Sequence, residues 1–134
     1  MADKITRCEK VKRVVSLWLP SLFWMAVIFV LSSLPGADFS SDGSANFWIR
    51  KALHIAEYTL LCVTYFRATK NAFLSIIFAI FYAAFDEVHQ SFVPTRTGKI
   101  SDFLIDSSGI LVTGLLLWKY LPVLPGKLKT WLLE

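Results

Sequence analysis

One stretch of this chain holds many of the side chains that enzymes use for chemistry. It carries two acids, an imidazole, an amide and a guanidinium within residues 86–96, directly after the apolar run from Ala72 to Phe85. Carboxylates and imidazoles transfer protons or bind metals, and a guanidinium binds phosphate or carboxylate groups. The stretch reads Asp86-Glu87-Val88-His89-Gln90-Ser91-Phe92-Val93-Pro94-Thr95-Arg96.

Two other stretches supply polar side chains at helical spacing. Residues at positions i, i+3 and i+4 share one face of a helix, and His54, Glu57 and Tyr58 have that spacing. Asp102 and Asp106 are four residues apart in a later segment. Within the third apolar segment the spacing places Tyr82, Asp86, His89 and Gln90 on one face, with Glu87 about 100° around from Asp86.

The composition predicts that these segments lie in a membrane. The 134 residues are 55% hydrophobic and 15% aromatic, and the mean hydropathy is +0.55. Four apolar segments each approach the roughly 20 residues that a spanning helix needs. We therefore expect an all-α, polytopic membrane protein in which residues 1–134 form one domain, a bundle of four transmembrane helices. The helices are expected at about residues 14–34, 47–66, 72–92 and 103–121.

The basic residues predict the orientation of the bundle. If the N-terminus is cytoplasmic, ten of the fourteen Lys and Arg residues fall on the cytoplasmic side, and the positive-inside rule then places both termini in the cytoplasm. The formal charge of +4 is thus interpreted as an orientation signal and not as a nucleic-acid interface. We expect the first apolar run to be retained as a helix, because it is long and lacks an A-x-A cleavage pattern. No disulfide is expected between Cys8 and Cys62.

In this topology three polar groups lie at the same depth in the membrane. His54, Glu57 and Tyr58 are near the start of the second helix, residues 86–90 are at the end of the third, and Asp102 and Asp106 are near the start of the fourth. All three groups are therefore expected in the outer leaflet. Charges in a membrane span are costly unless they are paired or hydrated, and they are candidates for function. We predict an outward-facing acidic and histidine pocket with three groups of site residues: catalytic His54, Glu57, Asp86 and His89; substrate-binding Tyr58, Gln90 and Arg96; and metal-binding Asp86, Glu87, Asp102 and Asp106.

A divalent metal is the candidate cofactor. Carboxylates and imidazoles together suit Mg²⁺, Mn²⁺ or Zn²⁺, and such an ion lowers the pKa of a bound water. The corresponding hypothesis is a metal-dependent hydrolase or transferase that acts on a lipid-linked substrate. The expected partners are membrane lipids or a lipid-linked cell-wall precursor, without nucleic acid, and an oligomer is compatible with the sequence.

Two other interpretations stay open. The acids and Arg96 can form a structural network of ion pairs that locks the helices together, although the acids outnumber the nearby cations. The same groups can carry protons or cations across the membrane, a function for which one four-helix subunit would have to oligomerise.

Three motifs together resemble the VanZ-like family of small bacterial membrane proteins, named after the teicoplanin resistance protein VanZ. They are His54-Ile55-Ala56-Glu57-Tyr58, the stretch 86–96, and Ser101-Asp102-Phe103-Leu104-Ile105-Asp106-Ser107-Ser108-Gly109; Leu31-Ser32-Ser33-Leu34-Pro35-Gly36 adds to them. The resemblance implies a protein of the bacterial inner membrane and cell envelope, linked to reduced susceptibility to lipoglycopeptide antibiotics. We expect it to bind and modify an anionic amphiphile: a polyprenyl-phosphate, a phospholipid or a cell-wall precursor. The alternative is a non-enzymatic membrane protein that alters antibiotic access by binding lipid or a partner.

Overall fold

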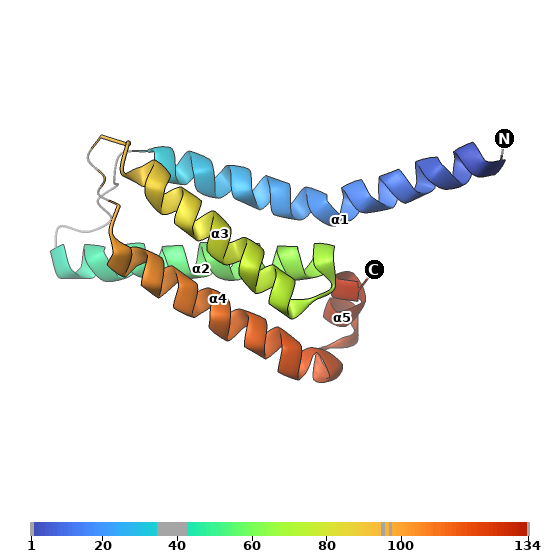
Figure 1. Ribbon diagram of the computed structural model, residues 1–134. Coiled ribbons are helices and arrows are strands. Elements are labelled where there is room, and N and C mark those ends of the chain that lie inside the picture. The colour runs from blue at the N-terminus through green and yellow to red at the C-terminus, as the bar shows by residue number, and fades with distance from the viewer. Residues whose placement is uncertain (1, 35–42, 95, 97, 134) are drawn as a thin grey trace.

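The chain folds into an antiparallel bundle of long helices (Figure 1). The computed structural model describes residues 2–34, 43–94, 96 and 98–133, with the side chains of the first helix described from residue 7. The elements are α1 (Ala2–Ser33), α2 (Gly43–Thr69), α3 (Ala72–Gln90), α4 (Ile100–Tyr120), the 3₁₀ turn η1 (Leu121–Val123) and α5 (Gly126–Leu133). The described ranges contain helices and no strand, which confirms the predicted all-α class.

The helix boundaries differ from the sequence prediction mainly at the two ends of the chain. The helix expected to begin near residue 14 begins at Ala2. The basic segment before residue 14 is rich in Lys, Arg and Glu, which favour helix, and the first proline is Pro20. Its N-terminal half extends past the other helices (Figure 1). The C-terminal segment, which lies beyond the last predicted helix, forms the separate helix α5.

Three helices are long and apolar enough to cross a membrane: Arg7–Ser33, Ala72–Gln90 and Ile100–Val123. The prediction of a multi-spanning membrane protein is therefore confirmed for three of its four helices. The second helix is long enough but is not among these apolar helices, and its sequence includes Arg50, Lys51, His54 and Glu57. It nevertheless packs against α1, α3 and α4 as a full member of the bundle.

Burial in the bundle follows the pattern of a protein in lipid. Large apolar side chains cover the outside, among them Phe73 (69% exposed), Phe81 (73%) and Trp118 (73%). The interior instead includes Asp86 and Asp106, which are 1% and 2% exposed. Polar groups gain from mutual contact in a bundle core, whereas apolar groups lose little by facing acyl chains.

A short turn joins α2 to α3. Lys70 adopts the left-handed conformation, with φ 56°, and its N–H donates to the carbonyl oxygen of Phe66 at 2.7 Å. This conformation is common just after the C-terminus of a helix. The side chain of Asn71 then caps α3 by accepting hydrogen bonds from the backbone N–H groups of Phe73 and Leu74. The reversal of direction is thus encoded within two residues.

A proline in α1 creates a binding place for Arg67 of α2. Pro20 has no N–H, so the carbonyl of Ser16 loses its partner within the helix. Nη1 of Arg67 donates to that carbonyl at 2.9 Å, and Nε donates to the carbonyl of Trp131 in α5 at 3.0 Å. The guanidinium also lies 4.9 Å from the centroid of the Trp131 ring. One side chain therefore joins α1, α2 and α5.

Glycines allow α4 to approach its neighbours. A Cβ on Gly109 would lie 3.3 Å from Cγ2 of Ile55 in α2. A Cβ on Gly114 would overlap the side chain of Ile76 in α3. This close packing brings the first turns of α4 beside the start of α2 and the end of α3, where the predicted polar residues lie.

Candidate functional site

A buried carboxylate joins α2 to α3. Oδ2 of Asp86 accepts a hydrogen bond from the hydroxyl of Tyr58 at 2.8 Å and another from Nε2 of Gln90 at 2.7 Å. Tyr58 and Asp86 are each 1% exposed. The other oxygen, Oδ1, is buried and has no hydrogen-bond partner among the described residues. Both donors contact the same oxygen, and the other oxygen remains available to a further donor or cation.

A second pair joins α2 to α4. Nδ1 of His54 lies 3.4 Å from Oδ2 of Asp106. A carboxylate at one ring nitrogen orients an imidazole and favours its protonated form. One turn closer to the start of both helices, Lys51 forms an ion pair with Asp102, which also accepts a hydrogen bond from Ser101 at 3.1 Å. The predicted convergence of the second and fourth helices is therefore present.

His89 lies away from these groups, against α1. Its ring stacks on Phe29 with centroids 4.5 Å apart, and its Nε2 lies 3.0 Å from the hydroxyl of Ser33. Arg96 also binds the end of α1: Nε donates to the carbonyl of Leu34 and Nη2 to that of Leu31, both at 2.9 Å. Both side chains therefore stabilise the C-terminal turn of α1, whose last carbonyls have no partner in the helix.

The remaining predicted acids have local partners or none in the described structure. The backbone N–H of Lys99 donates to the carboxylate of Glu87, which holds the α3–α4 connection. Glu57 is half-buried, and its backbone carbonyl accepts a hydrogen bond from the indole of Trp24 at 2.7 Å. Its carboxylate has no hydrogen-bond partner among the described residues.

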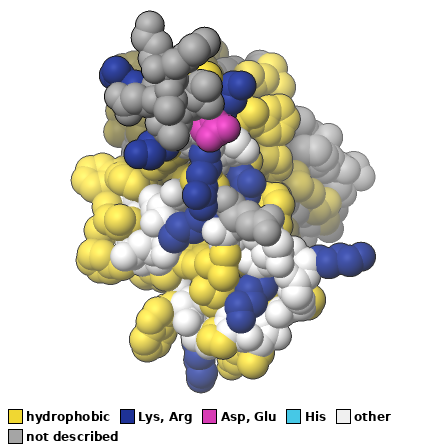
Figure 2. All heavy atoms as spheres, turned by 90° about the vertical axis from the view of Figure 1, so that its right-hand side faces the viewer, with side chains coloured by type: hydrophobic (Ala, Val, Ile, Leu, Met, Phe, Trp, Pro, Cys, Tyr) yellow, Lys and Arg dark blue, Asp and Glu magenta, His cyan; other side chains and the backbone are white. Residues whose placement is uncertain are grey.

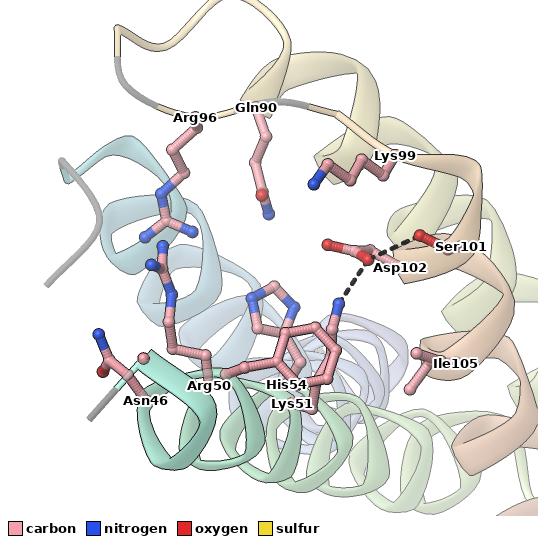
Figure 3. A pocket seen from close by; sticks show the side chains of 12 residues that line it. Asn46, Arg50, Lys51, His54, Gln90, Arg96, Lys99, Ser101, Asp102 and Ile105 are labelled. Atoms are coloured by element: carbon pink, nitrogen blue, oxygen red, sulfur yellow. Dashed lines mark hydrogen bonds and ion pairs between the residues drawn. The ribbon is translucent and has the colours of Figure 1, made fainter. Parts of the chain in front are cut away.

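A pocket of about 390 Å³ opens where α2 and α4 begin and α3 ends (Figure 3). We call it the cationic pocket, because the described residues that line it include four basic side chains and one carboxylate. Of the predicted site residues, His54, Gln90, Arg96 and Asp102 line it. Asp86, Tyr58 and Asp106 lie behind it and contact its lining through Gln90 and His54. The basic residues are Arg50, Lys51, Arg96 and Lys99.

Two of the basic groups face each other. Figure 3 shows the guanidinium groups of Arg50 and Arg96 next to each other on one side of the pocket, with Arg50 on α2 and Arg96 on the connection between α3 and α4. Burial lowers the pKa of Arg96 from its usual range, and the positive charge of Arg50 lowers the same pKa further. Arg50 has no hydrogen-bond or ion-pair partner among the described residues. Two like charges held together favour an anion between them.

The sequence prediction of the site missed Arg50 and Lys51. In the sequence they follow the aromatic pair Phe47-Trp48, and aromatic residues beside basic ones are typical of the membrane interface. They precede His54 by four and three residues, so helical spacing places them on the same face. Helical spacing could therefore have identified them, since the same spacing places His54, Glu57 and Tyr58 on one face.

The predicted metal ligands do not form one cluster. No three His, Cys, Asp or Glu side chains among the described residues gather closely enough to hold a metal ion. Asp86, Glu87, Asp102 and Asp106 each have a different partner, respectively Tyr58 with Gln90, the backbone of Lys99, Lys51 and His54. Since this arrangement does not fit a shared ion, we derive no step from a metal, and the predicted cofactor stays untested.

Comparison with known proteins supports the resemblance carried by the motifs. A search of the curated proteins and of the solved structures finds no significant match. The sequence model of the VanZ/LLP1 family, in contrast, matches residues 17–122. This range includes all of α2, α3 and α4 and the whole lining of the cationic pocket. The chain therefore belongs to the VanZ/LLP1 family.

Proposed function

We propose that this protein binds an anionic amphiphile at the cationic pocket. The observation that carries the proposal is the charge of the lining, with four basic side chains against the one carboxylate of Asp102. Guanidinium and ammonium groups bind phosphate and carboxylate through charge-assisted hydrogen bonds. A volume of about 390 Å³ is near the lower end of small-molecule pockets and suits a headgroup, while the acyl or prenyl chain would lie along the apolar outside of the bundle.

The helix directions add to the positive potential of the pocket. The N-terminal turns of α2 and α4 both contribute to its lining, through Asn46 and Ser101 among others. A helix N-terminus carries a partial positive charge. The potential from the backbone therefore has the same sign as that from the basic side chains.

We further propose that α2 is a fourth span and that both termini lie in the cytoplasm of a bacterial cell. The end of the bundle opposite the pocket is rich in basic residues (Figure 2). They come from the start of α1, the α2–α3 turn, the end of α4 and α5: Arg7, Lys10, Lys12, Arg13, Arg67, Lys70, Lys119, Lys127 and Lys129. The positive-inside rule places this end in the cytoplasm and the cationic pocket at the outer face.

Cys8 provides a natural reporter of this topology. It is exposed near the N-terminus, whereas Cys62 is buried. In spheroplasts, a membrane-impermeant maleimide should leave the native protein unlabelled and should label it after lysis. A Phe92→Cys variant in a Cys8→Ser background provides the control at the opposite end, because Phe92 is 81% exposed. Labelling of Cys8 from outside intact cells would reverse the proposed orientation.

Binding is tested most directly at Arg50. We expect protein purified in a non-ionic detergent from bacterial membranes to retain anionic lipid in native mass spectra. An Arg50→Gln variant should retain about tenfold less, because a hydrogen bond to a charged group contributes roughly 1.5–3 kcal/mol. The matched control is Lys119→Gln, which removes a charge at the far end of α4. Equal lipid retention by wild type and both variants would contradict the proposal.

Chemical modification of the bound amphiphile is a second candidate function, favoured by the position of His54. Its Nδ1 faces Asp106, and its Nε2 has no partner among the described residues, while the side chain lines the pocket. This arrangement suits a general base that takes a proton from water or from an acceptor hydroxyl. In a cell, the envelope role proposed from the family resemblance would be reduced susceptibility to lipoglycopeptide antibiotics.

Two variants separate modification from binding alone. If His54 performs chemistry, His54→Ala should abolish the resistance phenotype while lipid retention persists. Asp86→Asn, which disturbs the buried carboxylate behind the pocket, should weaken the same phenotype. A full phenotype in both folded variants would refute modification, and the non-enzymatic alternative, in which binding of lipid or a partner alters antibiotic access, would then account for the phenotype.

A further inference from the structure

The number and arrangement of the basic groups narrow the class of ligand. Among the described residues of the lining, with His54 neutral, the four basic side chains exceed the one carboxylate by three positive charges. Lys51 is the only one of the four paired with Asp102. A phosphodiester carries one negative charge, whereas a phosphate monoester carries about 1.5 to 2 at pH 7. A singly charged headgroup would therefore leave most of the surplus charge uncompensated.

The pocket also presents its donors on two opposite walls. Arg50 and Arg96 form one wall, and Lys99 lies on the other side, beside the Lys51 and Asp102 pair (Figure 3). Arg96 is held in place by its hydrogen bonds to Leu31 and Leu34. Arg50 is unpaired among the described residues. A phosphate with several unesterified oxygens can accept hydrogen bonds from both walls at once. If one of these oxygens is esterified, its carbon substituent takes the place of a hydrogen bond to one wall.

We infer that the cationic pocket recognises a phosphate that has a single ester or anhydride substituent, as in a lipid phosphate monoester or diphosphate, in preference to a phosphodiester phospholipid. This inference rests on the proposed function, because it assumes that the amphiphile binds at this pocket. Of the three ligand classes expected from the sequence, it favours a polyprenyl-phosphate over a phospholipid and over a precursor whose diphosphate is substituted at both ends. Free inorganic phosphate shares the same chemistry and is distinguished by its lack of a chain.

The test compares two probes with the same tail. Dodecyl phosphate and dodecyl methyl phosphate differ by one ester methyl group and one ionisable oxygen. With full-length protein in a non-ionic detergent, we expect calorimetry to show about tenfold or more tighter binding of the monoester. Arg50→Gln should remove most of this difference, and Lys119→Gln should leave it unchanged. Lys99→Gln, on the opposite wall, provides a second pocket variant in case the first folds poorly.

The binding results distinguish failure of the inferred phosphate preference from failure of the proposed amphiphile binding. Equal affinity for the two probes, with both lost in Arg50→Gln, would overturn the inference and leave the proposed function intact. Failure of both probes to bind would overturn both. Inorganic phosphate that binds as tightly as dodecyl phosphate would support phosphate recognition but overturn a lipid source. Phosphate that binds at least tenfold more weakly than dodecyl phosphate would support the lipid monoester.

Discussion

The four tyrosines of this chain provide a graded test of the buried polar layer. Each Tyr→Phe substitution removes one hydroxyl and leaves the ring, and the hydroxyls differ in what they contact. That of Tyr58 donates to the carboxylate of Asp86 at 2.8 Å, and that of Tyr82 donates to the carbonyl of Met25 at 2.6 Å. That of Tyr65 lies 3.1 Å from Sδ of Met25. Tyr120 is 44% exposed, and its hydroxyl has no hydrogen-bond partner among the described residues.

The expected loss of stability for each variant follows from the group that accepts the tyrosine's hydrogen bond. Tyr58→Phe should lower the free energy of unfolding by about 1–3 kcal/mol, because it removes one of the two donors to a buried oxygen of Asp86. The loss is not replaced by water, because Tyr58 and Asp86 are each 1% exposed. Hydrogen bonds between neutral groups inside membrane proteins average about 0.6 kcal/mol, which is the value expected for Tyr82. Thioether sulfur is a weak acceptor, so Tyr65→Phe should lower the free energy of unfolding less than Tyr82→Phe does. Tyr120→Phe should cause no measurable loss.

The assay is equilibrium unfolding in mixed micelles of a non-ionic detergent and dodecyl sulfate, monitored by circular dichroism. Tyr120→Phe is the internal control, because the chemical change is the same. If Tyr58→Phe lowers the free energy of unfolding no more than Tyr120→Phe does, the hydrogen bond to Asp86 does not contribute to stability, and the interpretation of Asp86 as a buried acceptor that needs this donor is wrong. A double-mutant cycle with Asp86→Asn then measures the pair directly.

Two further predictions concern packing away from the pocket. Arg67→Met should lower stability by about 1–3 kcal/mol, because the carbonyl of Ser16 left unpaired by Pro20 loses its donor; Lys119→Met, measured in the same micelles, is the control. Gly114→Val should lower stability by about 1–3 kcal/mol through overlap with Ile76. Gly126→Val, where no atom lies within 4 Å of an added Cβ, should not produce such a loss.

The general architecture of this chain could be predicted from the sequence because membrane helices are encoded locally. The length and apolar content of a segment predict a span, and helical spacing predicts which polar residues share a face. These rules place Tyr58, Asp86, His54 and Asp106 in one layer, and the contacts of these residues agree.

The docking of α5 depended instead on tertiary contacts that spacing does not encode. The segment from Gly126 to Leu133 is short and bears two lysines, so its sequence indicates only an amphipathic tail. Its place against the bundle comes from Arg67 and from Leu132, which is 1% exposed. A partner that lies 64 positions away in sequence, as Arg67 and Trp131 do, cannot be found from local periodicity.

His89 illustrates a second limit of helical spacing. The spacing places it on the same broad face of α3 as Asp86 and Gln90, which led to the prediction of a single site. In the bundle that face is shared between two neighbours, because α3 packs against both α1 and α2. Asp86 contacts α2 and His89 contacts α1. Spacing predicts a face, but the positions of the neighbouring helices decide which residues on that face meet.

The cationic pocket changes the chemical interpretation of the polar layer. From the sequence, the surplus of acids favoured a metal, since carboxylates outnumbered the nearby cations. In the structure Asp86 and Asp106 lie behind the pocket, where Tyr58, Gln90 and His54 contact them, and the basic side chains line the opening. An acidic layer that orients polar and basic groups toward a ligand suits anion binding better than cation binding. The ligand expected from the geometry is therefore opposite in charge to the cofactor expected from composition.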